Sequence, residues 1–254
     1  MAEQAIALRE YPQLIELLAV LEQNGLTKER EEVSSLVEYI GSMEDTLAQI
    51  RSELQEMHEE VKCIQDKGLQ IRCSRLLGTA QEKVMQTGEM VSTVKTNFVR
   101  AAGNAVKTFK EKGRTALVQA VRAMKIPTVL SKMKNSLHTV GKSMQEAAGK
   151  VDAKREQLHE AGAHLQNAGR ALSGKPAQAV STLESDKGIL AKLRKSLEGL
   201  GRTFSAMGDR AGNLEETLQK DGSEQKPSVK TSLRVLKSGQ AAKTSAPVQT
   251  EQVR

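Results

Sequence analysis

The residues of this sequence that come nearest to a chemical motif are Gly169, Gly174 and Lys175. Their spacing matches the start of a phosphate-binding loop, G-x-x-x-x-G-K, whose backbone amides and lysine hold nucleotide phosphates. The next residue of that motif is a Ser or Thr that binds magnesium, but here it is Pro176. The motif should also follow a strand and open a helix, whereas here it ends a helical pattern. We interpret the match as coincidental.

The sequence also offers no convincing metal ligands and no convincing catalytic nucleophile. His159 and His164 are five residues apart, not the three or four that share one helix face. No cluster of cysteines or carboxylates completes a metal site. Cys63 has no identifiable activating base. The sequence therefore predicts a protein that is not an enzyme, with no metal, no cofactor and no small-molecule substrate.

The surface that could bind an anion is a basic stripe on a helix expected around residues 95–125. At 100° per residue, an apolar side is formed by Phe98, Ala102, Phe109, Ala116 and Ala120. The basic side and its flanks are formed by Arg100, Lys107, Lys110, Arg114, Arg122 and Lys125. Such a stripe suits nucleic-acid phosphate or an anionic membrane surface. It carries no aromatic side chain for base stacking, so any nucleic-acid binding would be non-specific.

The charge of the chain changes sign near Gly68. Residues 1–66 have a net charge of −10, residues 67–145 of +12 and residues 146–254 of +5, which gives +7 for the whole chain. The basic part could meet phosphate, anionic lipid or the protein's own acidic arm. The charges could equally form solvated helix faces. A bend near Gly68 would fold the acidic arm against the basic one.

The elements that carry these residues are predicted from apolar spacing. The clearest pattern is a heptad repeat within 27–66, whose ten seam positions are Val33, Leu36, Ile40, Met43, Leu47, Ile50, Leu54, Met57, Val61 and Ile64. A repeat this regular keeps one stripe of a helix against a neighbouring helix. We therefore expect a coiled coil or bundle, and a helical protein partner or self-association.

The rest of the chain also reads as helical. We expect a short helix in 1–26, with Pro12 in its first turn and Asn24-Gly25 at its end, and Thr27 capping the next helix. Residues 67–126 read as one basic amphipathic helix with an eleven-residue repeat, ending near Lys125 because of Pro127.

Two further heptad helices are expected in 127–220. The first repeats Val151, Leu158, Leu165 and Leu172 with small companions apart from Arg155, and Gly174 and Pro176 end it. The polar residues 221–254 are expected to be mostly disordered.

Composition supports an all-α class of long helices forming an elongated coiled coil or helical bundle. The chain has no Trp, two Tyr and three Phe, and 27% of its residues are charged. It lacks an apolar run of about 20 residues, and its N-terminus does not resemble a signal peptide. Two cysteines ten residues apart are read as reduced thiols. We therefore expect a cytoplasmic protein.

Three stretches carry a family resemblance: NGLTKEREEVSSLVEYI (24–40), STVKTNFVRAAGNAVKTFKEKGRTALVQAVRAMKIP (92–127) and KPSVK (226–230). They resemble an uncharacterised family of gut Firmicutes that is often encoded on integrative or conjugative elements. The resemblance implies a bacterial cytoplasmic accessory protein linked to a mobile element, and it assigns no site residue. Together these observations predict a helical interaction or structural protein. The alternatives are a non-specific DNA-binding accessory and a peripheral membrane protein.

Overall fold

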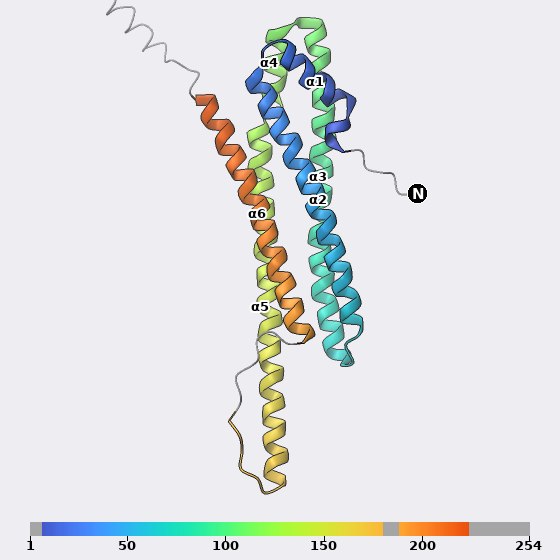
Figure 1. Ribbon diagram of the computed structural model, residues 1–254, viewed down its shortest axis with the longest axis vertical. Coiled ribbons are helices and arrows are strands. Elements are labelled where there is room, and N and C mark those ends of the chain that lie inside the picture. The colour runs from blue at the N-terminus through green and yellow to red at the C-terminus, as the bar shows by residue number, and fades with distance from the viewer. Residues whose placement is uncertain (1–6, 180–187, 224–254) are drawn as a thin grey trace, which may run out of the picture. The chain divides into compact units, whose positions relative to one another are not determined.

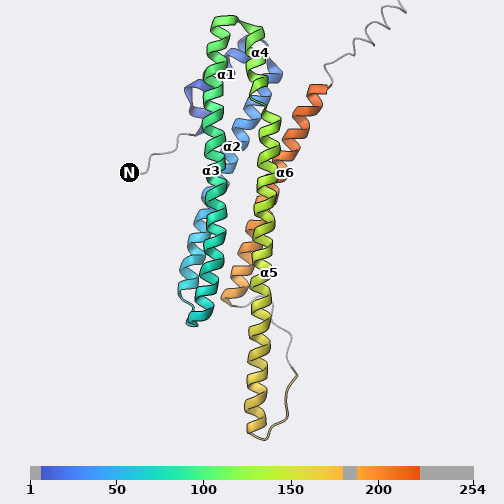
Figure 2. The ribbon, with the colours of Figure 1, turned by 180° about the vertical axis from the view of Figure 1, so that it is seen from behind.

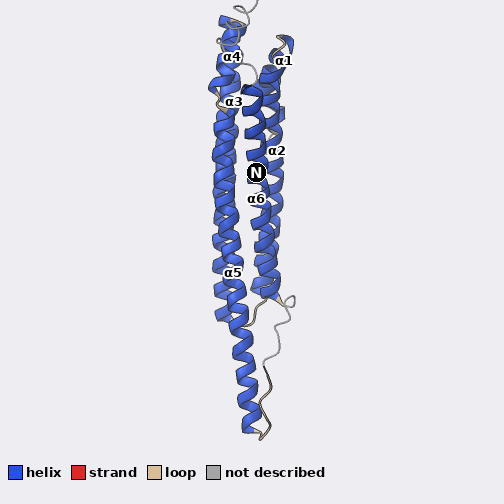
Figure 3. Cartoon of the chain, turned by 90° about the vertical axis from the view of Figure 1, so that its left-hand side faces the viewer, coloured by secondary structure: helices blue, strands red, loops and turns tan. Residues whose placement is uncertain are grey.

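The computed structural model describes residues 7–179 and 188–223, and these form helices and loops with no strand among them (Figures 1 and 3). The elements are a 3-10 turn, Leu8–Glu10, and the helices α1 (Pro12–Gln23), α2 (Thr27–Lys62), α3 (Lys67–Lys112), α4 (Arg114–Ala123), α5 (Ile126–Leu172) and α6 (Ile189–Ser223). The predicted all-α class of long helices is confirmed. The predicted disordered tail lies outside the described residues, apart from 221–223 at the end of α6.

The chain divides into two compact units, residues 1–215 and 216–254. The second is described only at 216–223, which continue α6. The architecture below is that of the first unit. Among all described helices, none has an apolar stretch long enough to cross a membrane.

The junction between α1 and α2 follows local backbone rules. Pro12 opens α1, where its missing N–H costs nothing. At the other end, Gly25 has a φ of 63°, and the amide of Leu26 donates to the carbonyl of Leu21 at 2.9 Å. This is a Schellman turn, and its closing apolar residue, Leu26, is buried. The expected cap at Thr27 is wrong, because Thr27 is the first helical residue of α2. Leu26, whose amide closes the turn after α1, occupies the cap position instead.

The acidic helix α2 and the basic helix α3 form an antiparallel hairpin, as Figure 1 shows. The turn between them ends at Asp66, whose carboxylate accepts from the amide of Leu69 at 2.9 Å and caps α3. Farther along, Lys95 is buried in the hairpin, and its Nζ lies 2.8 Å from Glu44 Oε1. The same ammonium lies 5.6 Å from the centre of the Tyr11 ring. The bend expected near Gly68 thus pairs the two arms within one chain.

The expected single helix over 67–126 is wrong, because it breaks at Gly113. That residue has a φ of 77°, a region that glycine enters without steric cost. The chain turns there, and α4 packs back against α3. A second break follows at Lys125, which has a φ of 51°. Pro127 then lies in the first turn of α5, a position that proline favours, and the predicted helix boundary near Lys125 is confirmed.

Helices α2, α3, α5 and α6 form an up-and-down four-helix bundle. Figure 2 shows α3 and α5 side by side, and they are in contact. Helices α2 and α6 are joined by a hydrogen bond, in which the Tyr39 hydroxyl of α2 donates to the Met207 carbonyl of α6 at 2.9 Å. Burial of this side chain raises the pKa of Tyr39, and nearby Arg210 only partly opposes that rise. The phenol therefore stays a neutral hydrogen-bond donor.

Two glycines set how closely α5 and α6 approach. A Cβ placed on Gly141 of α5 would lie 2.9 Å from the carbonyl oxygen of Gly201 in α6 and 3.2 Å from the amide nitrogen of Ser205. A Cβ on Gly201 would lie 3.0 Å from the carbonyl oxygen of Gly141. The two backbones therefore meet where neither helix carries a side chain.

Candidate functional site: an exposed leucine face on α5

The heptad seam of α2 is used inside the molecule. Nine of its ten positions, from Val33 to Val61, are buried. The tenth, Ile64, is half-buried and lies in the turn after α2, because the helix ends at Lys62. The expected coiled-coil helix over 27–66 is thus shorter by four residues. A partner for this seam is present in the same chain, since α3 packs against α2.

The six basic residues expected on one helix face are all exposed, but they do not share a helix. Arg100, Lys107 and Lys110 lie on α3. The turn at Gly113 moves the other three to α4 and the junction after it, so the continuous stripe is wrong. Lys110 Nζ lies 2.7 Å from Glu16 Oε1, and Lys107 Nζ lies 4.0 Å from Glu111 Oε1. Two of the six charges are therefore partly compensated within the fold.

The weak chemical motifs lie at helix termini and on helix surfaces. Gly174 and Lys175 close a Schellman turn after α5, in which the Lys175 amide donates to the Arg170 carbonyl at 2.8 Å. In the described part of the chain, no group of three or more His, Cys, Asp or Glu could hold a metal ion. On the exposed acidic side of α2, a hydrogen bond from Lys62 lowers the pKa of Glu59. These groups are arranged as a solvated helix surface.

The C-terminal half of α5 carries an apolar stripe that the rest of the described fold leaves uncovered. Its heptad begins at Val151, which is buried, and continues at Leu158, Leu165 and Leu172. The exposed fractions of these three leucines rise along the helix, from 47% to 77% to 91%. We call these three residues the leucine face. In Figure 1 this part of α5 continues past the ends of α2 and α3.

Small residues separate the leucines. Between Leu158 and Leu172 the sequence repeats L-x-x-A-G twice, with Ala161-Gly162 and Ala168-Gly169 next to the leucines on the same side. Such residues allow the backbone of a second helix to come close, while the leucines supply the apolar area. Large and small side chains therefore alternate along one face.

The chain that follows α5 returns along a different side of the helix. The side-chain amide of Asn167 donates to the Gln178 carbonyl and its oxygen accepts from the Gln178 amide, both at 2.8 Å. Arg170 Nε donates to the carbonyl of Pro176 at 2.8 Å. At about 100° per residue, Asn167 and Arg170 lie on the side opposite Leu165. The described part of the return segment reaches the edge of the leucine face near Leu158 and Gly162, and it leaves Leu165 and Leu172 open.

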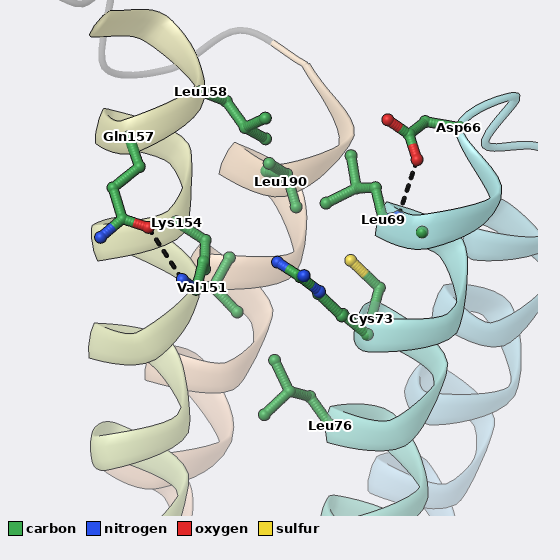
Figure 4. Close-up of a pocket in the computed structure, with 11 residues that line it drawn as sticks. Asp66, Leu69, Cys73, Leu76, Val151, Lys154, Gln157, Leu158 and Leu190 are labelled. Atoms are coloured by element: carbon green, nitrogen blue, oxygen red, sulfur yellow. Dashed lines mark hydrogen bonds between the residues drawn. The ribbon is translucent and has the colours of Figure 1, made fainter. Parts of the chain in front are cut away.

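A hollow of about 240 Å³ lies at the base of the leucine face, between α3, α5 and the start of α6 (Figure 4). We call it the root hollow. Its apolar lining is Leu69, Leu76, Val151, Leu158 and Leu190. Leu158 belongs to both features, so the apolar surface is continuous from the hollow onto the helix. Burial raises the pKa of Cys73 in its wall, which favours the neutral thiol over the more nucleophilic thiolate.

Polar side chains border the root hollow without entering a common site. Asp66 is engaged in capping α3, and Lys154 Nζ donates to Gln157 Oε1 at 2.8 Å. Figure 4 shows these pairs on opposite sides of the hollow, with leucines between them. Arg72 also lines the hollow, so an apolar side chain that enters it would meet leucines together with one guanidinium group.

The described chain is an all-α bundle with one long helix that presents an uncovered leucine face. The chain belongs to a family described as a family of unknown function (DUF6674), whose match covers residues 10–254. No curated protein and no solved structure matches the chain. The fold and the leucine face are therefore the basis for a functional proposal.

Proposed function

We propose that this protein is a helical interaction protein that binds another helix through the leucine face of α5. The observation that carries the proposal is the rise in leucine exposure along a regular heptad. Leucines that recur every seven residues keep one line of contact with a neighbouring helix. The described fold supplies that neighbour only as far as Val151.

A site-specific cross-link tests this proposal in cells that produce the full chain. A photoreactive amino acid in place of Leu165 is expected to attach to another polypeptide, because this position would lie inside the contact. The matched control is the same amino acid in place of Glu156, which is exposed and lies on the far side of α5. Equal labelling at both positions, or no labelled polypeptide, contradicts the proposal.

A second candidate, non-specific nucleic-acid binding, is favoured by the exposure of all six predicted basic residues. Among the described residues, Arg100 and Arg114 have no acidic group within ion-pair distance, so their charge is available to phosphate. Replacing both with Glu is expected to weaken DNA binding at low salt at least about tenfold.

The measurement is a gel shift over a salt series, in which the variant should also lower the salt slope by about two. The control carries the same change at two exposed lysines of α5, Lys142→Glu with Lys150→Glu. The wild-type chain failing to bind DNA at low salt would reject this second candidate. The link to a mobile element, which the family resemblance implies, stays a prediction about context.

A further inference from the structure

We propose that the occupant of the leucine face is the same face of a second copy of this chain, running antiparallel. This inference rests on the proposed function and names its partner. It is drawn from the repeat on α5, the charges beside it and the root hollow at its base.

The repeat is complementary to itself when one copy is reversed. Placing Leu165 opposite Ala161 of the second copy also places Leu158 opposite Ala168. By symmetry, each alanine of the first copy then faces a leucine of the second. Each of these four layers pairs a large side chain with a small one, which lets side chains interdigitate without voids. A parallel pair would instead stack leucine on leucine and leave the small layers empty.

The charges along this part of α5 permit the pairing. The whole chain has a net charge of +7, but residues 152–172 hold three acidic and three basic residues. The positions that border the leucine face are Gln157, Gly162, His164 and Gly169, and Lys154 lies on the same side one turn before Leu158. In the antiparallel register no Lys, Arg, Asp or Glu of one copy is brought opposite a like charge. Along α5 itself the pairing therefore brings no like charges together, unlike a pairing through the basic surface of α3 and α4.

The same register gives the root hollow an occupant. If Leu165 lies opposite Ala161 of the second copy, then Leu172 of that copy lies beside Lys154, which borders the hollow. Leu172 is the most exposed of the three leucines, at 91%. Its side chain would enter between Leu69, Val151 and Leu158, and two symmetric hollows would be filled at once. The register thus gives the exposed terminal leucine a contact at the root hollow, whose lining includes Arg72 as well as leucines.

The contact spans about three heptads in each copy, so it is a small interface. We expect a dimer that forms as concentration rises, with a dissociation constant on the order of micromolar. Leu165→Lys should raise this constant at least about tenfold, because it brings an ammonium into each of two symmetric apolar layers. The control, Glu156→Lys, introduces the same side chain on the far side of the same helix and should leave dimerisation unchanged.

Sedimentation of the purified full chain over a concentration series measures this effect, and circular dichroism checks that each variant keeps its helices. Leu165 is largely exposed, so the fold should tolerate the substitution. A wild-type chain that stays monomeric well above micromolar concentration overturns the inference. Labelling of a different polypeptide at position 165 in cells would then still support the proposed function, so the two proposals fail separately.

Disulfide cross-linking decides the direction of the pair. In a chain with Cys63→Ser and Cys73→Ala, molecules carrying Leu165→Cys are mixed with molecules carrying Ala161→Cys. The antiparallel register predicts a disulfide between the two kinds of molecule. It predicts none between two Ala161→Cys molecules, whose cysteines would be offset by four residues, about 6 Å along the helix. Rapid cross-linking of Ala161→Cys with itself indicates a parallel pair and overturns the proposal.

Discussion

The Leu47→Asp variant is expected to lose most of its cooperative helical structure. Leu47 lies in the middle of the α2 seam, and only 3% of it is exposed. The substitution removes a buried leucine and leaves a carboxylate among apolar side chains. The first effect alone costs about 2–5 kcal/mol, and the buried charge adds to it. Such a loss is comparable to the whole stability of many domains.

Thermal unfolding followed by circular dichroism measures the effect, and the neighbouring residue supplies the control. Ala48 is exposed on the same turn of α2, so Ala48→Asp changes helix propensity and charge without entering the seam. Its cost should stay below about 1 kcal/mol. If both variants melted together with the wild type, α2 would not be packed through its heptad side.

The heptad of α2 shows what sequence can establish in this protein. Nine of the ten predicted positions are buried, because a strict seven-residue repeat defines one side of a helix whatever the partner is. The same argument could not name the partner. Either an external helix or the basic arm could cover the α2 seam. The hairpin turn that ends at the Asp66 cap brings α3 against it, so α3 is the partner.

Helix α3 was harder to predict because its buried side carries few large residues. Its buried positions follow a heptad through Val84, Thr87 and Val91, and then step by four to Lys95 before continuing at Phe98. Such a step shifts the buried side of the helix locally. Counted from Val84, the step gives one eleven-residue spacing, to Lys95. It also places a lysine in the core, where Glu44 neutralises it.

The leucine face was visible in the sequence as a repeat, but its role was not. Val151 and Leu165 stand at equivalent heptad positions, yet one is buried and the other is exposed. Their difference depends on where the other helices end, which heptad spacing does not encode. The root hollow is formed by residues that are far apart in the chain, such as Leu69, Val151 and Leu190, so no local pattern could reveal it.

Replacing Gly141 and replacing Gly149 with alanine are expected to change stability in opposite directions, although both glycines lie on α5. Gly149 has open space around it, so alanine there should stabilise the helix by about 0.5–1 kcal/mol through its higher helix propensity. At Gly141 the new methyl would lie 2.9 Å from the Gly201 carbonyl oxygen and 2.7 Å from the Ser205 hydroxyl. The serine side chain could rotate, but the carbonyl belongs to the backbone of α6.

Helix α6 would therefore have to move away from α5, which loosens the side chains packed on either side of the crossing. Overpacking of this kind typically costs about 1–3 kcal/mol, more than the propensity gain returns. Chemical denaturation of the two single variants measures the difference, with the midpoint rising for Gly149→Ala and falling for Gly141→Ala. Equal stabilisation by both would mean that α5 and α6 do not touch through their backbones. The antiparallel packing of α6 on α5 would then need a different register.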